Sequence, residues 1–326
     1  MSSGTENSTI TPAENGARSL YWYVDGDWEH SAADIEELPL PLREKVSEVS
    51  MSFVKATPNG QPDFNYIDFP SAKKARELFP RADIALALAG GSESGNDRAW
   101  NTVLAQPEQF IPPLINTARN LGASAIKLDY EGPIDNPDTY LDFVAKTSEA
   151  LGEEGLAMGV AANVAVLGHS TEYLQQLADS AVLEVMTYDQ YGPWSREIGP
   201  VSATDWTVDS MRHFTERGID PARLSVGVPF YGYTYRGKRP GKKAQPVDEG
   251  IRNVEIEKLQ AGTDWAADQI DGASYLINKN SSEIISFVSS DDISERLHRL
   301  GSLGITNAFG WHAGQLTPSS LEVFVS

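Results

Sequence analysis

The stretch AIKLDYEG at residues 125–132 is where the fold can first be recognised in the sequence. Its apolar residues are typical of a buried strand, and an amphipathic helical stretch follows at 138–155. Lys127, Asp129 and Glu131 alternate along the same run. Because residues two apart on a strand point to one face, three charged side chains are expected to converge.

Similar strand-like runs occur eight times along the chain. The predicted strands are residues 19–26, 46–54, 83–91, 125–131, 156–163, 182–189, 223–232 and 305–313. The clearest helices between them are predicted at residues 71–79, 138–155, 170–179, 205–218 and 292–304. This alternation predicts parallel βαβ units, and eight such units close into an α/β (β/α)8 TIM barrel. A doubly wound open sheet is the competing fold, but ALAGGSESG at 87–95 contains no G-x-G-x-x-G phosphate turn.

The domain organisation follows from composition. Residues 1–18 are small and polar, and we expect a disordered tail there. Residues 19–326 are expected to form a single domain. About 50 residues, roughly 238–290, interrupt the alternation with a basic stretch, a helix and a hairpin, and we expect a small insertion after the seventh strand, on the face where barrel active sites lie.

Charge restricts the class of partner. The formal net charge is −20, from 46 acidic and 26 basic residues. This disfavours nucleic acids and anionic membranes, because both are bound through basic surfaces. A carbohydrate or another small-molecule substrate fits better, although the acidity fits solubility or a saline habitat equally well. No apolar run approaches the roughly 20 residues of a membrane span. We expect a monomer, in the cytoplasm or secreted.

No cofactor is predicted. The chain has no cysteine, which excludes thiolate catalysis and disulfides. Its five histidines show no metal-ligand spacing, so we expect no metal site.

Candidate site residues lie at the carboxyl ends of the predicted strands, where barrel enzymes carry their catalytic groups. Carboxylates among Trp and Tyr side chains suit a carbohydrate. The set comprises Tyr23, Asp129, Glu131, Tyr188, Asp189, Tyr231, Tyr233 and Trp311, with Trp194 on the loop after the sixth strand.

Asp129 and Glu131 permit two interpretations. They lie about 6–7 Å apart along a strand, and as a catalytic pair they would titrate together. Alternatively, Lys127 neutralises both acids in a buried ion cluster that only packs the barrel.

The motifs LDYE, MTYD, GVPFYG and FGWHA, in this order, resemble glycoside hydrolase family 18, the chitinase and endo-β-N-acetylglucosaminidase family. The resemblance runs from about Leu20 to Gly314 and implies a (β/α)8 barrel with the motif D-x-x-D-x-D-x-E on its fourth strand.

The resemblance also implies roles for single residues. Glu131 matches the general acid that protonates the glycosidic oxygen. Asp129 matches the carboxylate that orients the N-acetyl group, whose own oxygen is the nucleophile in this family. Tyr188 and Asp189 match the tyrosine and acid at that acetamido group. Trp311 matches the floor beneath the reacting sugar, and the pair Gly90–Gly91 matches the double glycine of the third strand.

Four positions depart from the family pattern. Ser124 and Lys127 replace the first and middle Asp of the motif, Leu88 replaces the serine before the double glycine, and Tyr233 replaces an Arg. A cation within about 4–6 Å lowers a carboxylate pKa by roughly 1–3 units. Lys127 is therefore expected to hold Asp129 ionised, turned down toward it, and to bias Glu131 toward its charged form. Burial opposes this effect, because it favours the neutral forms of the carboxylates and of the lysine. We therefore assign Lys127 a modulating role in the site.

Three functions remain open at this point. The first is a substrate-assisted hydrolase of β-1,4-linked N-acetylglucosamine. The second is a family member that binds chitooligosaccharides without cleaving them, or uses the acidic cleft on a different substrate, because Lys127 disrupts the acid pair. The third is a scaffold or storage protein.

Overall fold

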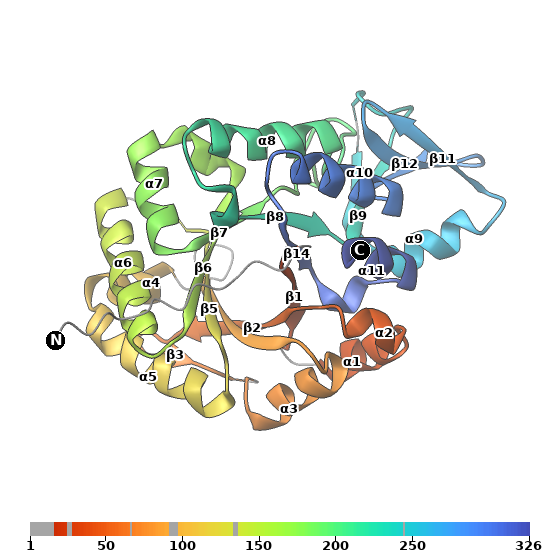
Figure 1. Ribbon diagram of the computed structural model, residues 1–326. Coiled ribbons are helices and arrows are strands. Elements are labelled where there is room, and N and C mark those ends of the chain that lie inside the picture. The colour runs from red at the N-terminus through yellow and green to blue at the C-terminus, as the bar shows by residue number, and fades with distance from the viewer. Residues whose placement is uncertain (1–15, 25–27, 66, 91–96, 133–135, 244) are drawn as a thin grey trace.

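The computed structural model describes residues 16–24, 28–65, 67–90, 97–132, 136–243 and 245–326 (Figure 1). Eight parallel strands form a barrel that closes where the first strand pairs with the second and the last. In chain order they are β1 (Arg18–Tyr23), β2 (Glu48–Ala56), β4 (Asp83–Gly90), β5 (Ala125–Tyr130), β6 (Ala157–Asn163), β7 (Val182–Met186), β8 (Leu224–Pro229) and β14 (Asn307–Trp311). A short strand, β3 (Pro62–Asp63), adds to β2 in antiparallel fashion.

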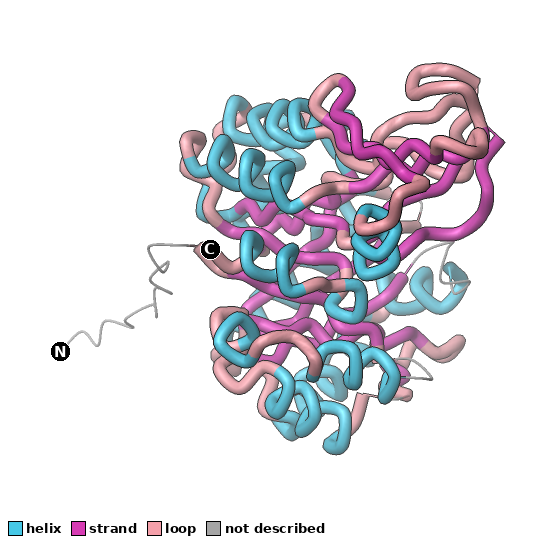
Figure 2. The backbone as a smooth tube through the Cα atoms, turned by 90° about the vertical axis from the view of Figure 1, so that its right-hand side faces the viewer, coloured by secondary structure: helices cyan, strands magenta, loops and turns pink. Residues whose placement is uncertain are grey.

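Helices cover the outside of the barrel (Figure 2). They are α1 (Trp28–Glu36), α2 (Leu40–Arg43), α3 (Phe69–Leu78), α4 (Asp97–Ala105), α5 (Pro107–Leu121), α6 (Pro137–Glu153), α7 (Thr171–Ser180), α8 (Thr204–Glu216), α10 (Ser290–Gly301) and α11 (Pro318–Phe324). Several begin at a capping side chain, such as Asn136 before α6 and Ser170 before α7. Within the part of the chain that the structure describes, no helix has both the length and the hydropathy to cross a membrane.

The predicted barrel is confirmed, and all eight strands occur where the sequence pattern indicated. Of the predicted tail, residues 1–15 lie outside the described residues, while Arg18 already belongs to β1.

The insertion after the seventh strand is also confirmed, as a five-stranded antiparallel sheet that projects from one side of the barrel (Figure 1). Its elements are β9 (Tyr231–Arg236), β10 (Gln245–Arg252), α9 (Asn253–Gln260), β11 (Trp265–Ile270), β12 (Ala273–Asn278) and β13 (Glu283–Phe287).

The seventh barrel strand is shorter than predicted, and the extra sheet starts earlier. The amide of Phe230 donates to the carbonyl of Trp311 at 2.8 Å, which is the last backbone hydrogen bond from this run to a barrel strand among the described residues. The chain then passes into β9, where a Cβ at Gly232 would lie 2.3 Å from the carbonyl oxygen of Ser286. Tyr231 and Tyr233 therefore belong to the insertion sheet, and placing them at the end of the seventh barrel strand was wrong.

The two faces of the barrel wall differ in residue size. Outward residues such as Leu86, Ile126 and Leu128 are fully buried against the helices. Inward positions next to β5 are small, since Lys127 pairs in register with Ala87 on β4 and with Gly159 on β6. The narrow interior consequently has room for a few long polar side chains.

Arg18 closes the barrel seam. Its Nε donates to the carbonyl of Phe324 at 2.6 Å, at the end of α11, and its guanidinium also donates to the carbonyl of Thr306 at 2.5 Å. Only 9 % of this residue is exposed. One side chain thus fastens the C-terminal helix and the approach to β14 onto β1.

We expect Arg18→Met to lower the free energy of unfolding by about 2–4 kcal/mol, because buried carbonyl acceptors lose charged donors. Urea denaturation followed by circular dichroism measures the change. The exposed Arg81→Met serves as the control, with an expected change within about 0.5 kcal/mol. Equal losses in the two variants would contradict the role of Arg18.

Candidate active site

The predicted catalytic residues meet at the carboxyl end of the barrel. Asp129 is on β5, Glu131 directly follows it, and Tyr188 and Asp189 follow β7. Burial, and then the charges of Asp129, Asp189 and Glu131, raise the pKa of Tyr188 well above its ordinary value. The hydroxyl of Tyr188 is thus held neutral amid three carboxylates.

Lys127 lies one layer deeper in the barrel and binds two glutamates. Its Nζ is 2.6 Å from Oε1 of Glu184 on β7 and 3.0 Å from Oε1 of Glu48 on β2. The other oxygen of Glu184 accepts the hydroxyl of Tyr21 at 2.5 Å. We call Lys127, Glu184, Glu48 and Tyr21 the interior network; it links strands β1, β2, β5 and β7.

Glycine makes the position of the lysine possible. A Cβ at Gly159 would lie 2.6 Å from Cδ of Lys127, so a larger residue there would force the lysine side chain to shift. Burial opposes the charge of Lys127, but the charges of Glu184 and Glu48 outweigh it and raise the Lys127 pKa above its ordinary value.

The interior network changes the expected effect of Lys127. The described ion pairs of its ammonium join it to Glu184 and Glu48, and neither is one of the acids beside it along the strand. One ammonium faces two carboxylates, so the layer beneath Asp129 carries no excess of positive charge. The alternative in which Lys127 neutralises both Asp129 and Glu131 is wrong about its partners.

Asp189 connects the barrel to the insertion sheet. The hydroxyls of Tyr231 and Tyr233, both on β9, donate to its Oδ1 at 2.5 and 2.8 Å. Its backbone φ is +56°, a left-handed conformation that is uncommon for a residue other than glycine. Burial and then the Asp189 charge raise the pKa of Tyr231 well above its ordinary value, so the phenol remains a donor.

Aromatic rings line the barrel mouth. Trp311 at the end of β14 stacks on Phe53 with ring centroids 5.8 Å apart, and its ring lies 5.6 Å from that of Tyr21. Tyr23 is 39 % exposed and meets Phe53 edge to face. Trp194 is 62 % exposed and lies edge to face against Tyr233. The two exposed rings are thus available to a ligand at the mouth.

The glycine position on the third barrel strand has a packing role. A Cβ at Gly90 would lie 2.5 Å from the indole of Trp100 and 2.6 Å from the ring of Tyr130. Its partner in the motif, Gly91, lies outside the described residues.

Sequence reasoning missed Glu184, Glu48 and Tyr21. Glu184 had a usable signal, because an acid in the middle of the apolar run VLEVM lies on the same face of the strand as Met186. Glu48 and Tyr21 had no signal of their own. Within the described residues, no group of three or more His, Asp or Glu side chains could hold a metal ion.

We expect Lys127→Met to lower the free energy of unfolding by about 3–5 kcal/mol, because it leaves the buried Glu184 and the partly buried Glu48 without their cation. Adding Glu184→Gln should recover part of the loss, since the amide oxygen still accepts from Tyr21. Urea denaturation of both single variants and the double variant measures the coupling.

The control is Lys146→Met, whose 2.7 Å pair with Asp142 is on the exposed face of α6. Its expected change is within about 0.5 kcal/mol. A Lys127→Met variant as stable as this control would contradict the interior network.

His312 predicts a loss of stability in acid. Burial and then the charge of Arg252 lower its pKa to about 4, against about 6.5 in an unfolded chain. Between these values the unfolded chain binds the proton and the folded protein does not, so His312 makes stability fall as pH falls through this window, by up to about 1.4 kcal/mol per pH unit. Chemical denaturation from pH 7 to 4 should show a shallower fall for His312→Gln than for wild type. The exposed His213→Gln is the control, and identical profiles for wild type and His312→Gln would contradict the prediction.

Known sequences similar to this chain are chitinases and chitinase-like proteins. The profile of glycosyl hydrolases family 18 matches residues 19–315. Endochitinase 1 of Metarhizium robertsii is 22 % identical over 255 residues, which is 70 % of this chain and 60 % of that protein. Class V chitinase of Arabidopsis thaliana is 26 % identical over 179 residues, 48 % of this chain and 47 % of that protein. The chitinase-like mite allergen Der p 18.0101 of Dermatophagoides pteronyssinus is 21 % identical over 156 residues, 47 % of this chain and 34 % of that protein. The matches thus span about a third to three fifths of these relatives' own lengths.

Solved structures share the fold. The class V chitinase of Nicotiana tobaccum has a TM-score of 0.81 at 18 % identity, covering 94 % of this chain and 98 % of that one. A GH18 chitinase mutant from Cycas revoluta, solved in complex with (GlcNAc)4, has a TM-score of 0.78 at 17 % identity and covers 95 % of this chain and 99 % of that one. The profile match across most of the chain carries the assignment: this chain belongs to glycosyl hydrolase family 18.

Proposed function

We propose that the chain hydrolyses β-1,4-linked N-acetylglucosamine, in chitin or chitooligosaccharides, by a substrate-assisted retaining reaction. The observation that carries the proposal is the position of the partly buried Tyr188 at the barrel mouth, near Asp129 and Glu131 at the end of β5 and next to Asp189 in the chain. A phenol donor and an acid placed around one point are what a reacting acetamido group and glycosidic oxygen require.

Each residue has a step in this reaction. Glu131 gives its proton to the glycosidic oxygen while the bond from that oxygen to C1 breaks. The acetamido oxygen of the same sugar bonds to C1, oriented by Asp129 and by a hydrogen bond from Tyr188. Glu131 then takes a proton from the water that opens the oxazolinium ring, so that the acid is restored and the configuration retained.

The interior network supports hydrolysis in the absence of the motif's middle acid. Glu184 and Glu48 balance the positive charge of Lys127, so the layer beneath Asp129 is not cationic. The proton of Tyr21 is likewise committed to Glu184. Burial, Glu184 and Asp129, in this order, raise the pKa of Tyr21, so its hydroxyl stays protonated.

The aromatic mouth supports a carbohydrate substrate. Trp311 would form the floor beneath the reacting sugar, and the exposed rings of Trp194 and Tyr23 would contact neighbouring sugars. Asp189, held by Tyr231 and Tyr233, would accept from a polar group of the same substrate. Aromatic faces pack against the apolar faces of sugar rings, and the acidic surface of the protein does not repel a neutral polymer.

We expect Glu131→Gln to lower turnover of a chromogenic chitobioside or chitotrioside by about 10²–10⁴-fold, because the amide cannot protonate the leaving oxygen. Binding of chitotriose, measured by calorimetry, should change by less than about threefold, since shape and polarity are kept. Glu149→Gln, an exposed position on α6, is the control and should retain full turnover.

Two results would count against hydrolysis. Equal turnover in wild type and Glu131→Gln would remove Glu131 from the reaction. Saturable binding of chitotriose by wild type with no release of reducing ends would instead identify a binding protein.

A further inference from the structure

Arg296 on α10 is a buried guanidinium that the proposed reaction does not use. It is 0 % exposed, and burial lowers its pKa to about 10, against the opposing charges of Asp292 and Glu295. Its described hydrogen bonds go to a neutral residue, and its Nε has no partner among the described residues. A buried charge is costly unless its donors are satisfied, so the two acceptors are what keep Arg296 in place.

Both acceptors belong to Ser202. Nη1 of Arg296 donates to the Ser202 hydroxyl at 3.0 Å, and Nη2 donates to the Ser202 carbonyl at 3.0 Å. The planar guanidinium thus binds the side chain and the main chain of one residue, which fixes both its position and its orientation. Ser202 is only 2 % exposed, so these bonds are formed away from solvent.

The Ser202 hydroxyl connects the guanidinium to the turn that carries two proposed site residues. We call residues 187–191 the site turn; it includes Tyr188 and the left-handed Asp189. Oγ of Ser202 donates to the carbonyl of Thr187 at 2.6 Å. Because the same oxygen accepts from a positively charged group, the hydroxyl becomes a stronger donor to that carbonyl.

The residues around Ser202 hold the rest of the site turn. We call residues 200–203 the backing segment. Its carbonyls accept the amides of Gln190 and Tyr191 at 3.0 and 3.1 Å. Another amide of the segment donates to Oε1 of Gln190 at 3.0 Å. Arg296 therefore fixes a segment whose hydrogen bonds flank both proposed site residues.

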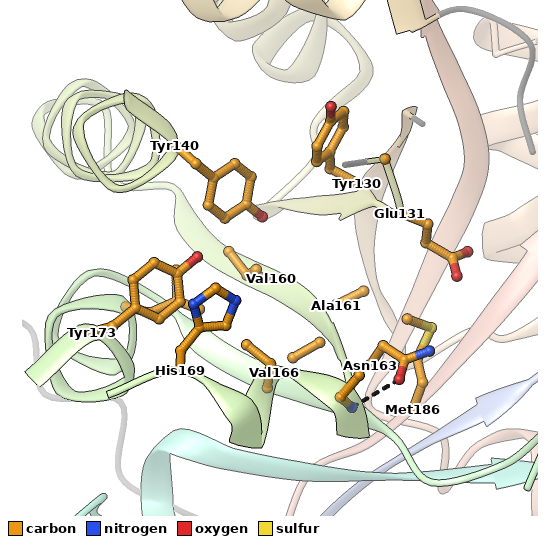
Figure 3. Close-up of a pocket in the computed structure, with 14 residues that line it drawn as sticks. Tyr130, Glu131, Tyr140, Val160, Ala161, Asn163, Val166, His169, Tyr173 and Met186 are labelled. Atoms are coloured by element: carbon orange, nitrogen blue, oxygen red, sulfur yellow. Dashed lines mark hydrogen bonds between the residues drawn. The ribbon is translucent and has the colours of Figure 1, made fainter. Parts of the chain in front are cut away.

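Tyr188 has little freedom to compensate for a displaced backbone. Its Cε1 lies 2.8 Å from the point that a Cβ of Gly227 would occupy, so its ring packs directly on the main chain of β8. Met186, at the end of β7, lines a cavity of about 360 Å³ that Glu131 also lines (Figure 3). The end of β7 and the proposed general acid thus border one space. A shift of the site turn would therefore move the Tyr188 hydroxyl relative to that acid.

We propose that Arg296 is a positioning residue for the hydrolysis, which acts through Ser202 to hold the backbone of Tyr188 and Asp189 where both side chains can meet the reacting sugar. The kinetic part of this proposal rests on the proposed function, whereas the restraint on the site turn does not. Correct placement matters most in the transition state, so removal of the guanidinium should lower turnover more than substrate binding.

Arg296→Ala tests the proposal with a chromogenic chitotrioside as substrate. We expect kcat to fall by about 10–100-fold and KM to change by less than about threefold. Ser202→Ala, a smaller change that leaves the guanidinium in place, should lower kcat by about 3–30-fold. Added guanidinium ion at a non-denaturing concentration should restore part of the kcat of Arg296→Ala, because it can occupy the vacated site. It should restore none of the kcat of Ser202→Ala.

The matched control is Arg18→Ala. Arg18 is also a buried arginine that binds main-chain carbonyls, but it is the first residue of β1 and lies at the end of the barrel opposite the site. Its kcat per folded molecule should stay within about twofold of wild type although its stability falls. Thermal melts define a temperature at which all three variants are folded. A loss of kcat in Arg18→Ala as large as that in Arg296→Ala would make Arg296 a general stabiliser and overturn the proposal.

Hydrogen exchange measured by mass spectrometry tests the restraint without turnover. Peptides that contain Gln190 and Tyr191 should exchange about tenfold faster in Arg296→Ala and Ser202→Ala than in wild type or Arg18→Ala, because the backing segment opens more often. If wild type cleaves no N-acetylglucosaminide, the proposed function fails, and this exchange alone decides whether Arg296 holds the site turn. Unchanged exchange in both variants, or a rise in KM at constant kcat, would overturn the positioning role.

Discussion

The buried ammonium of Lys127 is the constraint on which the rest of the site depends. A cation inside a barrel is tolerated only with close partners, and here Glu184 and Glu48 supply them from two other strands. Gly159 on the strand between leaves room for this arrangement, because the aliphatic part of the lysine side chain packs over it. The interior network thus links β1, β2, β5 and β7 inside the barrel. The other strands are held by backbone hydrogen bonds and by packing against the outer helices.

The aromatic wall of the site stands on this charged layer through Tyr21. Its hydroxyl donates a hydrogen bond to Glu184. The centroid of its ring lies 5.7 Å from that of Phe309 and 5.6 Å from that of Trp311. Trp311 in turn stacks on Phe53. Trp311, the proposed sugar floor, is thus connected through Tyr21 to the ion pair of Glu184 and Lys127. Residues that would not touch the substrate therefore help to position it.

Much of this organisation was predictable from the sequence. Strand periodicity located all eight barrel strands, and parallel strands necessarily bring Asp129, Tyr188 and Trp311 to one end. Glu184 could be recognised as an acid within an apolar strand, but its pairing with Lys127 was not predictable, since the two residues are 57 positions apart. The end of the seventh strand was misplaced because the run through Tyr231 and Tyr233 keeps its β-like alternation while the chain changes sheets.

Asp189 has a consequence for how this protein could be altered. Both tyrosine hydroxyls that hold its carboxylate come from β9, on the insertion, while the residue itself follows a barrel strand. Shortening or exchanging the insertion would therefore alter the site as well as the insertion itself. It would leave a backbone in the left-handed region carrying a carboxylate that has lost its two tyrosine donors. The barrel and the insertion each supply one side of this contact, so neither can be replaced without regard to the other.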